Sequence, residues 1–281
     1  VLSETLQAAM AGGEQVVKLL DTVPDVLDPA NPIELPAIRG RVTFDHVSFR
    51  YRPELPEVLH QINLDIQPGQ TVALVGPTGA GKTSIGNLIA RFYDVSAGAV
   101  LIDGLDVRTV TQRQLHQQIG LVPQDSFLFS GTIADNIRFG CPEATAAEVE
   151  HAAKLANAHD FIMAKPDGYG TRVQEGASNL SVGQRQLVCI ARAILTDPRI
   201  LILDEATSNV DSLTESLIQD ALRRLLQGRT AVVIAHRLST IRNADVICVV
   251  QDGQIVEQGQ HEDLLARGGV YTALYQRQFA E

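Results

Sequence analysis

Residues 71–83 read Thr-Val-Ala-Leu-Val-Gly-Pro-Thr-Gly-Ala-Gly-Lys-Thr, and this stretch decides the fold. The apolar run up to Val75 predicts a strand buried on both faces, and the apolar spacing from Ile85 to Phe92 predicts a helix. A glycine-rich turn joins the two. Because backbone N–H groups converge at the start of a helix, a loop in this position is suited to bind an anion.

The loop matches the phosphate-binding pattern G-x-x-x-x-G-K-[ST] in the strand-to-helix context that its mechanism requires. Lys82 can place a point charge against the outer phosphates, and the Thr83 hydroxyl can ligate Mg²⁺. The alternative is a plain glycine-rich turn, but a Lys-Thr pair at this point has no packing role. The nucleotide-binding residues expected from the loop are Gly76, Pro77, Thr78, Gly79, Ala80, Gly81, Lys82, Thr83 and Ser84.

Two adjacent acids, Asp204 and Glu205, follow a second apolar run at Ile200–Leu203. They are predicted to lie at the carboxyl end of a buried strand, where open α/β sheets bind ligands. Asp204 can hold Mg²⁺ directly or through water, and Glu205 can orient the water that attacks a γ-phosphate. An Asp-Glu pair can also cap a following helix. Beside a phosphate loop, we expect the catalytic arrangement.

The other apolar patterns predict an α/β fold with two kinds of sheet. Further buried runs at Ala231–Ala235 and Val246–Val250 indicate a parallel core, with helices between its strands. Alternation over residues 42–51 changes phase after Phe44, which indicates a bulge, and a second alternating segment ends at Pro68-Gly69. These two segments predict an N-terminal antiparallel sheet. Residues from about 127 to 186 lack apolar runs, which predicts a helical insertion.

Residues 1–39 are expected to precede the folded domain, which begins near Gly40 and extends to residue 281. Residues 1–20 have loosely helical apolar spacing, interrupted by Gly12 and Gly13. Residues 23–36 contain four prolines and few apolar residues, which predicts an extended tether rather than part of a core. The first residue is Val1, which suggests a piece of a longer protein. No apolar run reaches the roughly 18 to 20 residues that span a bilayer.

Composition narrows the class of function. A chain of 281 residues with 45% hydrophobic residues can bury a core, and a net charge of −10 argues against a nucleic-acid binder. Cys141, Cys189 and Cys248 have the spacing of neither a zinc cluster nor a disulfide framework, so a reduced cytosolic setting is the default.

The segment Leu180-Ser181-Val182-Gly183-Gln184, which precedes a helical pattern, resembles the signature segment of ABC ATPases. The common form has glycine where Val182 stands. A serine hydroxyl and glycine N–H groups at a helix start can form a second anion site. The resemblance implies that Ser181, Gly183 and Gln184 contact ATP bound to an opposite subunit. Ser181 as a simple helix cap is the alternative, which explains the serine but not the other two residues.

Other positions match the same family one at a time. Tyr51 resembles the aromatic residue that stacks on adenine, Gln124 resembles the glutamine that reaches the metal and the attacking water, and His236 resembles the switch histidine at the γ-phosphate. The alternatives are an ordinary strand residue at Tyr51, a surface polar residue at Gln124 and a structural strand-end histidine at His236. The resemblance implies catalytic roles for Lys82, Gln124, Glu205 and His236, and metal ligation by Thr83, Gln124 and Asp204.

Three further segments resemble the exporter type of this family. Residues 1–20 resemble the cytosolic end of a last transmembrane helix. Residues 171–176, with Glu175, resemble a segment that touches the membrane domain, and residues 126–136 are similar to exporter sequences.

Ser208-Asn209-Val210-Asp211 resembles the D-loop of the family, which crosses the dimer interface near the other active site. A local turn or cap at Asp211 is the alternative.

The resemblance covers residues 40 to the C-terminal helix and implies a P-loop NTPase (RecA-like) core with an antiparallel β subdomain and a helical subdomain. It implies an exporter motor that binds ATP and Mg²⁺ and hydrolyses ATP at the cytoplasmic face of a membrane. Its partners would be a second ABC ATPase domain, identical or different, and transmembrane domains in the same chain. A soluble ABC ATPase and a regulatory cassette that does not hydrolyse ATP are the alternatives; the intact Lys82, Asp204, Glu205 and His236 argue against the second.

Overall fold

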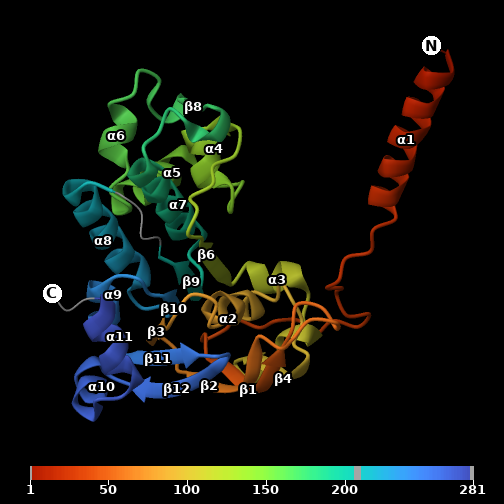
Figure 1. The fold of residues 1–281 in the computed structure, drawn as a ribbon. Coiled ribbons are helices and arrows are strands. Elements are labelled where there is room, and N and C mark those ends of the chain that lie inside the picture. Colours follow the sequence, from red (N-terminus) through yellow and green to blue (C-terminus); the bar gives the residue numbers. More distant parts are fainter. Residues whose placement is uncertain (1, 206–209, 279–281) are drawn as a thin grey trace.

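The computed structural model describes residues 2–205 and 210–278. In the described part of the chain, two large sheets, a two-stranded sheet and a group of helices form the body, and α1 stands apart from it (Figure 1). Three short 3₁₀ turns lie at Val107–Thr109, Gly168–Gly170 and Glu175–Ala177. The other elements are α1 (Leu2–Leu20), β1 (Val42–Phe49), β2 (Leu59–Ile66), β3 (Thr71–Val75), α2 (Lys82–Ile89), β4 (Ala97–Ile102), β5 (Leu105–Asp106), α3 (Gln112–His116), β6 (Ile119–Val122), β7 (Gly131–Thr132), α4 (Ile133–Arg138), α5 (Ala146–Leu155), α6 (His159–Met163), β8 (Arg172–Val173), α7 (Val182–Thr196), β9 (Ile200–Asp204), α8 (Ser212–Leu226), β10 (Thr230–Ile234), α9 (Leu238–Asn243), β11 (Val246–Gln251), β12 (Gln254–Gly259), α10 (His261–Arg267) and α11 (Val270–Gln278).

The central sheet has the strand order β12-β11-β3-β10-β9-β6. Its five strands from β11 to β6 are parallel, and β12 pairs with β11 in the antiparallel sense. The predicted parallel core is therefore confirmed, with the strand of the phosphate loop, β3, between β11 and β10. Every residue of β10 is buried, and only the first residue of β3 and the last of β9 are partly exposed. This explains why each reads as an apolar run.

The N-terminal sheet has the order β2-β1-β4-β5, and its neighbouring strands are antiparallel. The pairing of β1 with β2 shifts between Phe44 and Val47, and His46 lies between them at a φ of 48°. The phase change in the sequence marks this irregularity, as predicted. In β2 the buried residues Ile62, Leu64 and Ile66 alternate with exposed polar ones, which is the pattern of a sheet with one buried face.

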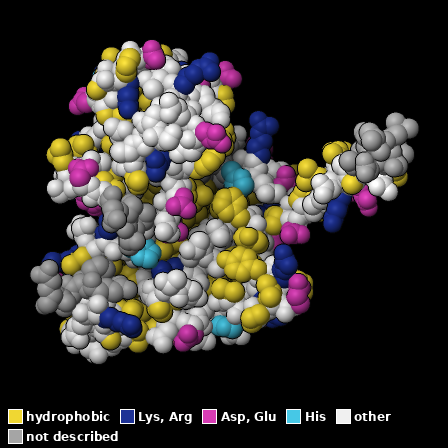
Figure 2. All heavy atoms as spheres, turned by 45° about the horizontal axis from the view of Figure 1, so that its top comes forward, with side chains coloured by type: hydrophobic (Ala, Val, Ile, Leu, Met, Phe, Trp, Pro, Cys, Tyr) yellow, Lys and Arg dark blue, Asp and Glu magenta, His cyan; other side chains and the backbone are white. Residues whose placement is uncertain are grey.

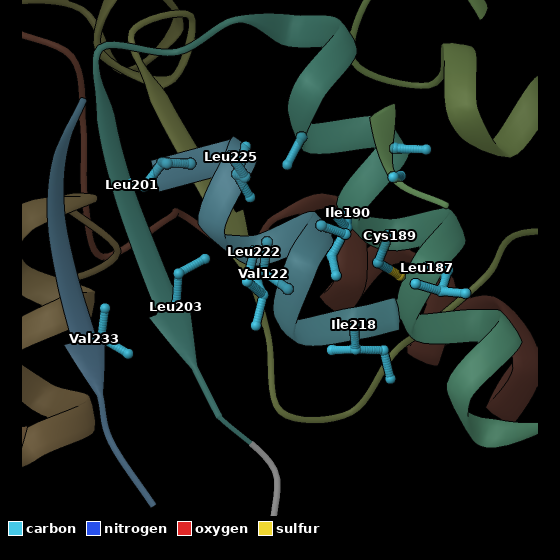
Figure 3. Close-up of a cluster of buried hydrophobic side chains, with 14 of the residues drawn as sticks. Val122, Leu187, Cys189, Ile190, Leu201, Leu203, Ile218, Leu222, Leu225 and Val233 are labelled. Atoms are coloured by element: carbon cyan, nitrogen blue, oxygen red, sulfur yellow. The ribbon is translucent and has the colours of Figure 1, made fainter. Parts of the chain in front are cut away.

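Residues 127–186 contain α4, α5, α6 and the start of α7, with the two-stranded β7–β8 sheet beside them. Helix α7 leaves this region and packs against α8 and β6. Figure 3 shows side chains of α7 and α8, among them Ile190 and Leu222, together with Leu203 of β9. All three belong to one buried apolar cluster, so the helical region and the parallel sheet have a common core.

The N-terminal segment differs in two ways from the sequence expectation. Helix α1 is continuous through Gly12 and Gly13. The following segment, 22–41, has neither helix nor strand, but it does contribute to a core, because Ile38 is buried and Leu35 packs against the cluster of the N-terminal sheet. The expectation of a tether outside any core is wrong for Leu35. In the part of α1 whose side chains are described, Met10, Val16, Val17, Leu19 and Leu20 are exposed, and Figure 2 shows hydrophobic side chains on the surface of this helix.

Among the described residues, no helix combines the length and the apolar character needed to cross a bilayer. The three cysteines are free thiols, of which Cys189 and Cys248 are buried.

Candidate nucleotide site

A cavity of about 670 Å³ lies beyond the carboxyl ends of the parallel strands. This is the position where open α/β sheets bind ligands. Residues from four strand ends and from the start of α2 meet there. The lining consists of Tyr51, Val58, Thr78, Gly79, Gly81, Lys82, Thr83, Ser84, Gln124, Asp204, Glu205, Ile234 and His236.

The loop between β3 and α2 has a backbone that requires glycine at specific points. A Cβ on Gly76 would lie 2.0 Å from the carbonyl oxygen of Val250, so no side chain fits there. Gly81 is the N-cap of α2 and has a φ of 106°, a conformation that L side chains rarely adopt. No side chain caps α2 there, and its N-terminal N–H groups lie at the cavity. This is a favourable place for phosphate oxygens.

Lys82 is the first residue of α2, and its side chain bends back over the loop. Its Nζ donates hydrogen bonds to the carbonyl oxygens of Gly76 at 2.8 Å and Pro77 at 2.9 Å. Burial lowers the pKa of this ammonium, and the charge of Asp204 opposes that effect. The loop therefore holds a cation at the cavity, next to the helix start.

Asp204 ends β9 and lies opposite that helix start, within hydrogen-bond reach of the Thr83 hydroxyl. Burial raises the pKa of Asp204, and the nearby charges of His236 and Lys82 counteract the rise. One carboxylate and one hydroxyl are few ligands, but Mg²⁺ typically uses one or two protein oxygens together with substrate phosphates and waters. The donor set therefore fits Mg²⁺ held jointly with a nucleotide.

Glu205 is 4% exposed, and its carboxylate is fixed by the segment that follows β10. The Thr240 hydroxyl donates to Oε1 at 2.5 Å, and the His236 backbone N–H donates to Oε2 at 3.4 Å. Burial raises the pKa of Glu205, and the Thr240 hydrogen bond counteracts the rise. Sequence reasoning missed Thr240, because a threonine in the first turn of a helix carries no signal of its own.

His236, Gln124 and Tyr51, which the resemblance suggested for the site, line the same cavity. Burial lowers the pKa of His236, Lys82 lowers it further, and Asp204 raises it. The Tyr51 hydroxyl is 2.7 Å from Ser84 Oγ, and the Tyr51 ring meets the Tyr93 ring edge-on with centroids 5.0 Å apart. The ring is thus fixed at the rim of the cavity.

Three residues of the predicted loop do not line the cavity but support it. Gly76 and Pro77 present their carbonyl oxygens to Lys82. Ala80 is buried beneath the loop, and its carbonyl oxygen accepts a hydrogen bond from the Gly253 N–H at 3.2 Å.

The signature-like residues lie elsewhere, at the start of α7. Ser181 is the N-cap: its hydroxyl accepts from the Gln184 N–H at 3.2 Å, and its own N–H donates to Gln184 Oε1 at 3.1 Å. A Cβ on Gly183 would lie 2.2 Å from Thr214 Cγ2 of α8. The cap accounts for Ser181 and Gln184, and packing against α8 accounts for Gly183, whereas the sequence suggested that a cap explains only the serine. Ser181 and Gln184 line a separate cavity of about 330 Å³.

Two further predicted segments lie outside the cavity. Ser208 and Asn209 of the D-loop-like stretch fall outside the described residues, and Asp211 caps α8 by accepting from the Thr214 N–H at 2.9 Å. Glu175 is exposed at the start of a 3₁₀ turn.

A phosphate loop at the carboxyl end of an interior strand of a parallel sheet, opposite a pair of carboxylates, defines the class of P-loop nucleotide-binding domains. The family model described as ABC transporter matches residues 59–208, more than half of the chain. The chain belongs to this family and is one of its ATP-binding domains.

Two ABC transport proteins match nearly the whole chain. It is 52% identical over 266 residues to a fatty acid ABC transporter ATP-binding/permease protein of Mycobacterium bovis, covering 95% of the chain and 42% of that protein. It is 50% identical over 280 residues to an ATP-dependent lipid A-core flippase of Syntrophus aciditrophicus, covering 100% of the chain and 46% of that protein. The chain therefore spans less than half the length of these relatives.

A solved structure of a bacterial Atm1-family ABC exporter with ATP bound superposes with a TM-score of 0.89. The two chains share 44% sequence identity, and the match covers 99% of this chain and 48% of the exporter chain. The fold class predicted from the sequence is confirmed.

Proposed function

We propose that this chain is the ATP-hydrolysing motor domain of an exporter, in which ATP-driven pairing of two such domains powers transport across a membrane. The observation that carries the proposal is the meeting of Lys82, Thr83, Asp204 and Glu205 in one cavity at the start of α2. Transport relatives that span more than twice this length support the wider role.

In the proposed reaction, the loop N–H groups and Lys82 bind the β- and γ-phosphates, and the Tyr51 ring packs on the adenine. Glu205 orients the water for in-line attack, while His236 and Gln124 contact the γ-phosphate and that water. When bound through Thr83, Asp204 and Gln124, Mg²⁺ would neutralise charge that develops on the phosphate oxygens. The buried setting of Glu205 supports its role, because burial raises the pKa of this carboxyl toward the range of a general base.

A second ATP-binding domain completes the site in this proposal. Ser181 and Gln184 do not line the cavity of their own chain. A partner domain would bring its Ser181, Gly183 and Gln184 to the bound ATP, and Val182, 40% exposed on the first turn of α7, would lie within that contact. ATP that binds the paired state more tightly than the separate domains shifts the population toward pairing.

Membrane domains are the other proposed partner, with this domain on the cytoplasmic face. Residues 1–39 would form the end of a last transmembrane helix and its linker, and the helical subdomain at about 127–186, with Glu175, would face the membrane domain. The exposed apolar side chains of α1, among them Met10, Val16 and Leu20, support this placement. An exposed apolar face typically marks a surface that is covered in an assembly.

The test is Mg²⁺-dependent ATP hydrolysis measured against protein concentration, for the wild type and Glu205→Gln side by side. We expect a specific rate that rises with concentration in the wild type and is absent from the variant, with ATP binding retained. An unchanged rate in the variant would refute the role of Glu205. Tight ATP binding without turnover at any concentration would favour a regulatory cassette over a motor.

A further inference from the structure

The carboxylate of Glu205 lies at the start of α9 rather than free in the cavity. Among the described residues, the helix start at Arg237 has no side-chain cap. Instead the Glu205 carboxylate accepts hydrogen bonds there, from the Thr240 hydroxyl at 2.5 Å and the His236 N–H at 3.4 Å. Thr240 is the third residue of α9. A residue 35 positions away thus contacts the proposed catalytic group directly.

The contact has the strength that positioning requires. Glu205 is 4% exposed, so few hydrogen bonds from water remain for it. A hydrogen bond to a charged group contributes more than one between neutral groups, and the Thr240 donor is close. Threonine is also β-branched, which limits the number of χ1 rotamers open to its hydroxyl.

The start of α9 is itself fixed to a second helix. Arg237 forms an ion pair with Glu215 of α8 at 2.6 Å, and the Arg237 side chain is only 14% exposed. The first turn of α9, which carries the Thr240 hydroxyl, is therefore attached to α8 through this ion pair. Glu205 still lines the nucleotide cavity while its Oε1 accepts the hydrogen bond from Thr240.

We propose that Thr240 is a positioning residue for ATP hydrolysis: its hydroxyl holds one oxygen of Glu205 so that the carboxylate presents a fixed face to the attacking water. The same contact ties the catalytic carboxylate to the segment that carries His236. This inference rests on the role proposed for Glu205 above. Thr240 itself does not line the nucleotide cavity.

The test compares Thr240→Val with Thr240→Ser in the whole chain. Valine keeps the shape and removes the hydroxyl, whereas serine keeps the hydroxyl. We expect Thr240→Val to lower kcat for ATP about ten- to a hundredfold, the effect of one hydrogen bond to a charged group, with KM and ATP affinity within about twofold of the wild type. Thr240→Ser should recover most of the lost kcat.

Ser239→Ala, one residue earlier on α9, is the matched control and should hydrolyse ATP like the wild type. If Thr240→Val is insoluble, Thr240→Ala provides the same loss of hydroxyl. A wild-type kcat in the variant lacking the hydroxyl, or equal losses in kcat and ATP affinity, would overturn the positioning role. Glu205→Gln, measured in parallel, separates the two proposals: if it still hydrolyses ATP at the wild-type rate, the role proposed for Glu205 fails, whereas if it is inactive and Thr240→Val is normal, this inference alone fails.

Discussion

The guanidinium of Arg91 donates a hydrogen bond to the backbone carbonyl of Leu27, 2.9 Å away and 64 residues earlier in the chain. The same group also donates to Asp94 at 2.9 Å and to the Val110 carbonyl at 3.1 Å, and its side chain is 3% exposed. Arg91 directly follows the C-cap of α2, the helix that begins at the phosphate loop. One end of α2 therefore faces the nucleotide cavity, and the other end holds the segment that leads back to α1.

Arg91→Met should release that segment. Methionine retains an apolar stem but donates no hydrogen bonds, so we expect a loss of about 3 kcal/mol in the free energy of unfolding and faster proteolysis between residues 22 and 36. Urea unfolding and timed protease digestion measure the two effects. The control is Arg113→Met on α3, where the side chain is exposed. Equal digestion of both variants would show that Arg91 does not secure the segment.

Lys82→Ala should weaken ATP binding at least about tenfold, because it removes a charged contact with the phosphates. Calorimetric titration of ATP into the variant measures this. Lys18→Ala is a suitable comparison, since Lys18 is exposed in the last turn of α1 and does not line the nucleotide cavity. Wild-type affinity in Lys82→Ala would exclude Lys82 as a phosphate ligand.

Gly183→Ala should destabilise the fold, because its Cβ would lie 2.2 Å from Thr214 Cγ2. Overpacking of this kind costs about 1–3 kcal/mol. The double variant Gly183→Ala/Thr214→Ser, which lacks that methyl group, should recover most of the stability in urea unfolding. Recovered stability without recovered ATP hydrolysis would indicate that Gly183 also contacts the partner's nucleotide. Failure to recover stability would contradict the packing explanation.

The contribution of His236 to the free energy of unfolding should decrease as the pH falls. Burial, aided by Lys82, lowers the pKa of His236 in the folded chain. The folded state is therefore favoured above the unfolded histidine pKa of about 6.5, and this advantage is lost as the pH falls from there through the lower folded pKa. We expect the free energy of unfolding of the wild type minus that of His236→Gln to decrease between about pH 7 and 5.5. A difference independent of pH would contradict the shift.

The buried strands could be predicted where their own residues are continuously apolar, as at β3, β9, β10 and β11. The parallel strand β6 was not predicted, because it has four residues, contains Gly120 and exposes Leu121. Its glycine is required by a neighbour distant in sequence, since a Cβ there would lie 2.6 Å from Pro198 Cγ. Such a requirement cannot be read from a local pattern.

The residues of the candidate site likewise fall into those that a local sequence pattern reveals and those that only the folded structure reveals. The loop residues and the pair Asp204-Glu205 are adjacent in sequence and match a chemical pattern, so they could be found. Thr240, which contacts Glu205 in the site, acts through a contact between distant segments and is otherwise an ordinary residue of its helix. The same holds for Arg91, outside the site, which binds the Leu27 carbonyl. The packing of Gly183 against Thr214 likewise appears only once α7 and α8 are placed side by side.

The buried cluster around α7 has a consequence for exchanging parts between relatives. Val149 of α5 and Ile162 of α6 belong to the same cluster as Leu201 of β9 and Val233 of β10. Figure 3 shows the last two of these residues. Helices that share a core with a sheet lose the partners for their apolar side chains when they are moved alone. A chimera that replaces residues 127–186 by those of another transporter should therefore fold only if the apolar faces of α7 and α8 are replaced with them.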